Sequence, residues 1–376
     1  MKQTASFIST YAGDWAGVCS SLYELGGMTV MHDPSGCNST YNTHDEPRWY
    51  DINSMVYISA LTEIDAIMGN DDKLIDDIIY TANELHPKFI AIAGTPIPMM
   101  IGTDFNAIAS IVREETNIPT FGFKTNGMHS YTLGALDALE AIGKEFVDKN
   151  VSKSLKNSVN ILGATPLDFS VNKSVESMKK LLKENDFNVI STWAMGSSLD
   201  EMKKASCASV NLVVSYSGMK IAKYLYEEFN IPYVISTPYG EKFSKKVIKD
   251  LQKAEDTKEN IISYDFRDFK EDAEVIIIGE GVTSESLAAS ITLNKNKSVR
   301  VLSGVECDEK LLLKGDKVTL DEDDIIPCLN KSQIIIADPL YKPICPDDCK
   351  FISLPHEGFS GRMFRKEIPN LIGKEL

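Results

Sequence analysis

Short apolar runs alternate with amphipathic stretches along most of the chain. The run at 89–93 is continuously apolar, which is typical of a strand buried on both faces of a parallel sheet. The stretch at 72–85 instead spaces its apolar side chains along one helical face: Leu74, Ile75, Ile78, Ile79 and Ala82. This alternation predicts repeated βαβ units, whose loops collect at the carboxyl ends of the strands.

The same pattern divides the chain into three units. Polar stretches at 148–157 and 254–260 interrupt it. We predict an α/β fold of three Rossmann-like open parallel-sheet domains, covering residues 1–152, 153–260 and 261–376. Further strands are predicted at 28–31, 55–59, 119–123, 159–162, 188–192, 210–214, 233–236, 275–278, 299–302, 333–337 and 351–354. Helices are predicted at 16–25, 104–115, 174–185, 199–205 and 219–229.

Charge and composition narrow the class of protein. Lys plus Arg number 39 and Asp plus Glu number 54, so the net charge is -15. This balance argues against a nucleic-acid or anionic-membrane partner. The first residues contain no apolar signal region, and no later run approaches the roughly 20 apolar residues of a membrane span. We therefore expect a soluble cytoplasmic protein. Its seven cysteines are an odd number and do not suggest a disulfide framework.

One turn stands out because it presents a thiol at the end of a strand. In GMTVMHDPSGCNSTY, at 27–41, the strand stops at Asp33-Pro34-Ser35-Gly36 and Cys37 follows. Open α/β sheets bind ligands at strand ends, yet a free cysteine is commonly a buried core thiol. Cys19 precedes the same strand. Two thiols per chain would supply the four thiolates of an iron–sulfur cluster at a homodimer interface.

Other candidate motifs carry weaker signals. Gly279-Glu280-Gly281 resembles the start of a dinucleotide fingerprint, but Ser284 stands where the third glycine belongs. Cys345 and Cys349 could share a metal, although zinc sites usually show two such pairs and a surface loop is the simpler interpretation. The chain contains neither a GxxxxGK[ST] loop nor an HExxH motif, so it is not itself a P-loop ATPase and a hydrolytic zinc site is unsupported.

Several collinear stretches resemble component 1 of nitrogenase and its relatives, which include dark-operative protochlorophyllide reductase and reductive cyclases of tetrapyrrole biosynthesis. The resemblance runs from about residue 10 to the C-terminus. The matching stretches are HDPSGC at 32–37, NDDKLIDDI followed by GTPIPMMIGTD at 94–104, IPTFGFKTNGMHSYTLG at 118–134, NLVVSYSGMKIAKYLYEEFNIPY at 211–233, ADPLYKP at 337–343 and LPHEGFSGR at 354–362.

This resemblance implies subunits that pair as homodimers or heterodimers around a 4Fe-4S cluster. A separate Fe-S reductase, the only partner to bind ATP, then supplies electrons. Cys37 matches the middle of the family's three cluster cysteines. Thr95 stands in place of the third, the first falls near Tyr11-Ala12, and Cys19 is the candidate substitute. Ser215 replaces the cysteine that anchors the nitrogenase metallocofactor. A hydroxyl is a poorer iron ligand than a thiolate, which argues against dinitrogen reduction.

The remaining candidates are proton donors and the lining of a substrate cavity. His32, Asp33 and His356 could donate protons, although for Asp33 a turn hydrogen bond is the preferred interpretation. The candidate cavity residues are Thr95, Lys124, Thr125, Asn126, Tyr216 and Ser217.

The sequence therefore predicts a nitrogenase-like oxidoreductase subunit that reduces a small molecule other than dinitrogen. Two alternatives remain open. The first is a scaffold or carrier that holds a metallocluster or tetrapyrrole without turning it over. The second is a subunit without a cluster that only binds a partner or a small ligand.

Overall fold

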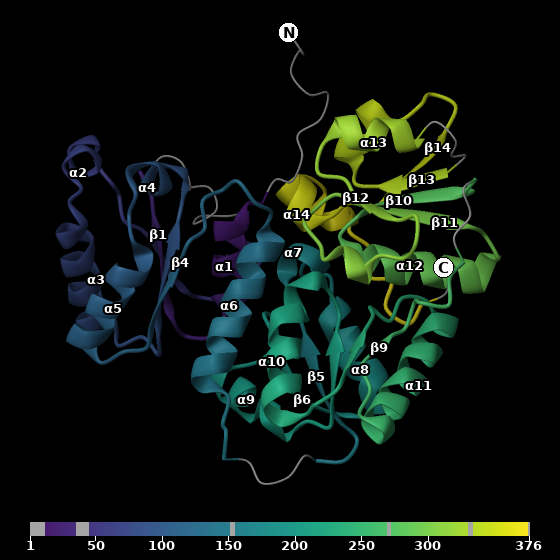
Figure 1. The fold of residues 1–376 in the computed structure, drawn as a ribbon, viewed down its shortest axis with the longest axis horizontal. Coiled ribbons are helices and arrows are strands. Elements are labelled where there is room, and N and C mark those ends of the chain that lie inside the picture. Colours follow the sequence, from purple (N-terminus) through teal and green to yellow (C-terminus); the bar gives the residue numbers. More distant parts are fainter. Residues whose placement is uncertain (1–11, 35–44, 151–154, 269–271, 330–333, 375–376) are drawn as a thin grey trace.

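The structure is a computed structural model and describes residues 12–34, 45–150, 155–268, 272–329 and 334–374. These residues form three parallel sheets with flanking helices, and the sheets make three lobes (Figure 1). The predicted α/β class and the three parallel sheets are confirmed. The division of the chain at 152 and 260 stays a prediction.

The N-terminal lobe holds a four-stranded sheet in the order β2-β1-β3-β4. Its strands are β1 (Met28–His32), β2 (Met55–Ile58), β3 (Ile90–Gly94) and β4 (Thr120–Phe123). Its helices are α1 (Asp14–Leu22), α2 (Glu63–Met68), α3 (Asp71–Leu85), α4 (Pro96–Ile101), α5 (Phe105–Thr116) and α6 (Tyr131–Phe146). The two ends of α5 illustrate how the sequence sets the limits of a helix. Asp104 accepts two backbone N–H groups at its start, and Asn117 ends it in the left-handed conformation.

The middle lobe holds a five-stranded sheet in the order β6-β5-β7-β8-β9. Its strands are β5 (Ser158–Leu162), β6 (Asn188–Thr192), β7 (Val210–Val213), β8 (Tyr233–Ile235) and β9 (Ile261–Ile262). Its helices are α7 (Pro166–Phe169), α8 (Ser174–Glu184), α9 (Leu199–Met202), η2 (Lys203–Cys207), η3 (Tyr216–Gly218), α10 (Met219–Phe229) and α11 (Glu241–Thr257). The polar stretch at 254–260 forms the end of α11 and the turn into β9.

The C-terminal lobe holds a five-stranded sheet in the order β12-β11-β10-β13-β14. Its strands are β10 (Val275–Gly279), β11 (Val299–Ser303), β12 (Lys317–Val318), β13 (Ile334–Ala337) and β14 (Lys350–Ser353). Its helices are α12 (Gly281–Lys295), η4 (Glu309–Leu311), α13 (Glu322–Leu329), η5 (Pro339–Ile344), α14 (Glu357–Ser360) and η6 (Gly361–Glu367). The residues after η6 return to the middle lobe, where the Gly240 N–H donates to the Leu371 carbonyl.

Helices α1 and α6 pack against each other where the three lobes meet (Figure 1). Gly134 of α6 has no room for a side chain, because a Cβ there would lie 1.8 Å from the Asp14 carbonyl oxygen. Because α1 and α6 approach so closely, Tyr131, the first residue of α6, is fully buried. Among the described residues, no helix has the length and apolar character that crossing a membrane requires.

Candidate functional site

The first cluster of candidate residues lies at the carboxyl ends of three neighbouring strands of the N-terminal lobe. His32 ends β1, and its Nδ1 lies 2.8 Å from the hydroxyl of Ser59, which follows β2. Thr95, after β3, places its Oγ1 2.8 Å from the His32 carbonyl oxygen and donates to the Asp33 carboxylate. Burial lowers the pKa of His32 to about 4, although the Asp65 carboxylate opposes this shift. His32 is therefore neutral at neutral pH.

The two candidate cluster cysteines are placed differently. Cys37 lies outside the described residues. Cys19 is fully buried in α1, within an apolar cluster that also contains Met31 and, from the C-terminal lobe, Ile276. Burial raises the pKa of its thiol well above the usual range, and the Glu46 carboxylate adds to the shift. The structure therefore surrounds Cys19 with the interior of its own chain and favours the protonated thiol.

The candidate residues after β4 mostly make hydrogen bonds that hold their own loop in place. Thr125 donates from its Oγ1 to the Gly94 carbonyl at 2.7 Å, and Lys124 is exposed. The backbone N–H groups of Asn126 and Gly127 both donate to the Asp14 carboxylate. Beyond them a cavity of about 270 Å³ opens between this loop and the C-terminal lobe, bordered by Gly127, Ser130, Gly304 and Glu306. These residues do not converge with His356.

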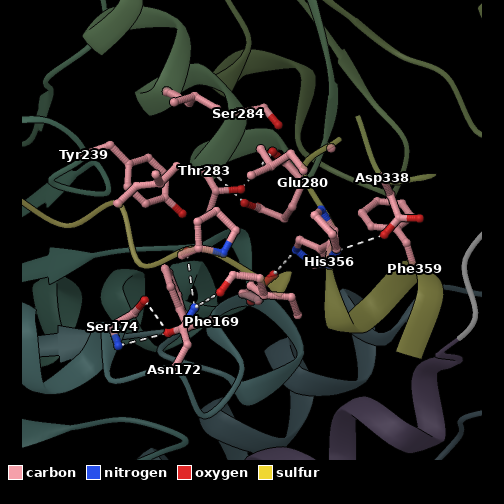
Figure 2. A pocket seen from close by; sticks show the side chains of 18 of the residues that line it. Phe169, Asn172, Ser174, Tyr239, Glu280, Thr283, Ser284, Asp338, His356 and Phe359 are labelled. Carbon is pink, nitrogen blue, oxygen red and sulfur yellow. Dashed lines mark hydrogen bonds and ion pairs between the residues drawn. The ribbon is translucent and has the colours of Figure 1, made fainter. Parts of the chain in front are cut away.

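A second cavity lies between the middle and C-terminal lobes, and we call it the interdomain pocket. Its volume is about 50 Å³, and its lining includes Asp168, Tyr239, Glu280, Asp338 and His356. Figure 2 shows that Glu280, from the start of α12, and His356, from the segment before α14, lie at the same end of this pocket. Among the described residues that line it there is no lysine or arginine.

Glu280 is held by its own helix. Because it is the N-cap of α12, its carboxylate accepts the N–H groups of Val282 and Thr283. A third N–H, from Tyr216 of the middle lobe, donates to the same carboxylate at 2.9 Å. Burial nevertheless raises the pKa of Glu280 to about 7, and the negative charge of Asp168 adds to the rise.

Asp168 is surrounded by hydroxyl groups. Its Oδ1 accepts the Tyr131 hydroxyl at 2.5 Å, and its Oδ2 accepts the Thr165 hydroxyl at 2.7 Å. The Nε2 atom of His356 lies 3.6 Å from the same Oδ1. Burial and the neighbouring carboxylate raise the pKa of Tyr131 far above its usual range, so Tyr131 stays a hydrogen-bond donor to Asp168.

His356 is fixed in one tautomer by the backbone. The N–H of Gly358 donates to its Nδ1 at 3.1 Å, so in the neutral ring the proton is on Nε2. That N–H faces the carboxylate of Asp168. In this tautomer Nε2 carries a proton but has no hydrogen-bond partner within the described part of the chain.

The other two candidates lie on η3. Tyr216 is half-buried, and its pKa is raised to about 12 by burial and the nearby Cys307 and Asp308. Ser217 is fully buried. Of the predicted cavity residues, Tyr216 is the one whose backbone contacts the pocket carboxylate Glu280.

Asp168 and its hydrogen-bond donor Tyr131 were not singled out from the sequence, and Glu280 was named only within the Gly279-Glu280-Gly281 turn. A signal for both carboxylates exists, because Asp168 lies in the first turn of α7, after β5, and Glu280 is the N-cap of α12, after β10, and open sheets bind ligands at strand ends. No pattern in the sequence indicates that Asp168 and Glu280 line the same cavity.

The comparisons with known proteins place the chain in a family. Residues 25–287 match the family model described as nitrogenase component 1 type oxidoreductase, so the chain belongs to this family. A light-independent protochlorophyllide reductase chain of Nostoc punctiforme is 28% identical over 193 residues, which are 49% of this chain and 38% of that protein. The nitrogenase iron-molybdenum cofactor biosynthesis protein NifE of Clostridium pasteurianum is 29% identical over 220 residues, which are 57% of this chain and 47% of that protein.

Solved structures match over a larger share of the chain. A structure described as nitrogenase Cp1 at pH 6.5 has a TM-score of 0.62 at 17% identity, covering 95% of this chain and 86% of that chain. The same protein at pH 5 gives 0.60 at 19% identity, covering 87% and 72%. The nitrogenase component 1-like fold is thereby confirmed. The chain spans less than half the length of the curated relatives above.

The described residues do not fit the two iron groups that the resemblance implies. They contain no group of three or more His, Cys, Asp or Glu side chains that could hold a metal. Ser215 is fully buried and donates to the Gly163 carbonyl at 2.7 Å, so its hydroxyl is already engaged. The interdomain pocket, at about 50 Å³, holds little more than a water molecule and cannot hold a bulky metallocofactor in this conformation. A 4Fe-4S cluster would depend on Cys37 and on thiolates from a second subunit.

Proposed function

We propose that the chain is a nitrogenase-like oxidoreductase subunit that does not fix dinitrogen. In this proposal it pairs with a second component 1-like subunit, identical or different, around a 4Fe-4S cluster bound by Cys37. An ATP-dependent Fe-S reductase supplies electrons, and a small molecule bound by the lobes is reduced. The cluster would supply one-electron transfer.

One observation carries this proposal: exposed apolar helices follow both strands that neighbour β1, the strand that precedes the Cys37 segment in sequence. That segment continues from β1, whose sheet neighbours are β2 and β3. Helix α2 follows β2 and helix α4 follows β3, and the two helices contact each other. Their large apolar side chains are exposed: Ile64, Ile67, Met68, Met99, Met100 and Ile101. We call this surface the α2–α4 face.

The exposure on the α2–α4 face is unusual for a monomer surface. Ile67 and Met68 are each 75% exposed, and Met100 is 80% exposed. Large contiguous apolar patches on soluble proteins commonly mark interaction sites. Iron–sulfur clusters are shielded by apolar packing, so a subunit docked on this face would also provide the environment that a cluster at Cys37 needs.

Iron analysis tests the cluster assignment. The protein is purified anaerobically, and its iron and acid-labile sulfide are measured. The Cys37→Ser variant should lose most of both, whereas the matched control Cys345→Ser, altered at a half-buried thiol of the C-terminal lobe, should keep them. A Cys37→Ser protein with the full iron content of the parent would contradict the assignment.

The docking assignment has its own test. Met100→Glu puts a charge on the α2–α4 face, at a residue that is 80% exposed, and should reduce the molecular mass measured by light scattering to that of the single chain. The control Met363→Glu changes a residue of η6 that is 69% exposed and should leave the mass of the assembly unchanged. Equal masses for the parent and both variants would argue against docking at this face.

A scaffold or carrier role is the second candidate function. The similarity to the cofactor biosynthesis protein NifE favours it, and the chain would then hold a metallocluster or tetrapyrrole without turning it over. A chain that only binds a partner or ligand is the third candidate. Turnover that requires both a reductase and ATP would favour the oxidoreductase. Cluster binding without turnover on any acceptor would favour the scaffold, and absence of iron and sulfide would favour the third.

A further inference from the structure

A cavity at the start of α6 has room for a small molecule, and we call it the Glu306 cavity. It lies between the loop that precedes α6 and the C-terminal lobe, and its volume is about 270 Å³. This volume is close to the roughly 300–1,000 Å³ of sites that bind drug-sized ligands. Gly13, Gly127 and Gly304 border the cavity, so part of its wall is bare backbone.

Glu306 belongs to the C-terminal lobe and is held firmly against the start of α6. Its Oε2 accepts the backbone N–H of Ser130 at 3.0 Å and also the Ser130 hydroxyl, and its carbonyl accepts the Thr132 hydroxyl at 3.2 Å. Burial acts to raise the pKa of Glu306, but the hydrogen bonds from Ser130 and His129 outweigh it, and the pKa lies below its ordinary value. Glu306 is therefore an ionised carboxylate at neutral pH.

This carboxylate fixes the tautomer of His129, which lines the same cavity. The Nδ1 atom of His129 lies 3.2 Å from Oε1 of Glu306. An ionised carboxylate only accepts hydrogen bonds, so Nδ1 carries the proton. In the neutral ring Nε2 is then an acceptor, and within the described residues it has no hydrogen-bond partner. The pair therefore provides one oriented acceptor for a molecule in the cavity.

The charges around the cavity decide which molecules suit it. The described lining residues include neither lysine nor arginine. Glu306 is ionised, and the carboxylate of Asp14 lies within electrostatic range of His129. Trp15 adds an aromatic ring to the lining, and aromatic rings attract cations. An anion is therefore disfavoured, whereas an uncharged or cationic molecule is not.

We propose that the Glu306 cavity binds a small uncharged or cationic molecule that donates an N–H group to the Nε2 atom of His129. His129 is the binding residue, and Glu306 is the positioning residue that keeps Nε2 free of a proton. The site and the class of its ligand go beyond the function proposed above. Only the step that makes this ligand the molecule to be reduced rests on that function.

Nuclear magnetic resonance of the purified full-length chain, with isotope-labelled histidine, tests this inference. The His129→Asn variant identifies the His129 signals. In the parent the neutral ring should carry its proton on Nδ1, and imidazole, used as the probe, should shift the Nε2 signal in a saturable way. Acetate at the same concentrations should leave the signal unchanged.

Two variants separate the role of Glu306 from that of a nearby carboxylate. In Glu306→Ala the neutral ring should carry its proton mainly on Nε2, and the Kd for imidazole should rise by about tenfold or more, because the oriented acceptor is lost. The control Glu309→Ala, at an exposed position of η4, should keep both the tautomer and the affinity of the parent.

A neutral His129 with its proton on Nε2 in the parent would overturn the inference. Acetate binding as tight as imidazole binding would also overturn it, and so would the Nδ1 tautomer without any saturable shift, which is the result expected of a merely structural ion pair. If Glu306→Ala does not fold, the comparison of imidazole with acetate in the parent still decides.

The measurement needs neither iron nor a reductase, so it is independent of the cluster test. Imidazole binding together with a failed Cys37 test would overturn the proposed electron route and leave the Glu306 cavity as a binding site. Iron bound through Cys37 without imidazole binding would overturn this inference alone.

Discussion

Thr95 donates its hydroxyl to the carboxylate of Asp33, which joins the loop after β3 to the loop after β1. The position that resembles a cluster cysteine in the family thus holds a residue that fixes the base of the segment leading to Cys37. Both residues are buried. The contact gives Thr95 a structural role that does not depend on iron.

The Thr95→Val substitution keeps the side-chain shape and removes the hydroxyl. It should lower the free energy of unfolding by about 1–3 kcal/mol, because it removes a hydrogen bond to a buried carboxylate. Urea denaturation followed by circular dichroism measures the change. Thr81→Val is the matched control, since Thr81 is a half-buried residue of α3 whose hydroxyl donates to the Asp77 carbonyl of the same helix in a solvent-exposed hydrogen bond. Its effect should be within about 0.5 kcal/mol, and equal losses in the two variants would contradict the prediction.

Arg48 is a buried cation that connects the N-terminal and middle lobes. It contacts Glu46 at 2.6 Å and Glu24 at 2.8 Å, and it donates to the Ala194 carbonyl. Arg48→Met would leave the buried carboxylate of Glu46 without its cation, so we expect a loss of about 3–5 kcal/mol in the free energy of unfolding.

The control for Arg48 is Arg113, which pairs with Glu145 at an exposed position. Arg113→Met should cost no more than about 1 kcal/mol. Thermal or urea unfolding of both variants checks the difference. An Arg48→Met protein as stable as Arg113→Met would show that the buried pair does not hold the lobes together.

The raised pKa of Glu280 predicts a pH-dependent stability. In the folded state the group titrates at about 7, above its ordinary 4.5. Between these values the folded state binds more protons than the unfolded chain, so this contribution to stability falls as the pH rises from about 4.5 to about 7 and stays lost above. Glu280→Gln removes the dependence.

The stability of Glu280→Gln relative to the parent should therefore rise across this pH range, by an amount on the order of 3 kcal/mol. Any constant cost of the amide cancels in the comparison of two pH values. Urea denaturation of both proteins below and above the range measures the change. A relative stability that stays flat with pH would mean that Glu280 titrates as an ordinary carboxyl.

The burial of Cys19 predicts that its thiol is unreactive in the native protein. Alkylation with iodoacetamide followed by mass spectrometry should modify Cys349, a partly exposed cysteine of the C-terminal lobe, well before Cys19. In denaturant both should react alike. Modification of Cys19 at the rate of Cys349 would indicate that α1 opens and would restore Cys19 as a candidate cluster ligand.

Much of the fold could be predicted from the sequence, because parallel strands buried on both faces have a simple pattern. The runs at 28–31, 89–93 and 210–214 are strands β1, β3 and β7, and the amphipathic stretch at 72–85 is α3. The predicted elements include no helix at 131–146. Helix α6 is buried against α1 and α10, so it lacks a single apolar face. Similarly, the charged α11 has a buried stripe that polar composition conceals.

The sequence by itself determined the parallel α/β class, the nitrogenase component 1-like resemblance and the loss of the cysteine at Ser215, because these depend on local patterns and collinear motifs. Only the tertiary structure decided that Cys19 is enclosed within its own chain and that Asp168 and Glu280 line one pocket. Those two carboxyl groups lie in separate lobes and far apart in sequence. Their shared pocket, and the raised pKa of Glu280, which comes first from burial and then from the charge of Asp168, exist only once the lobes pack together and exclude water.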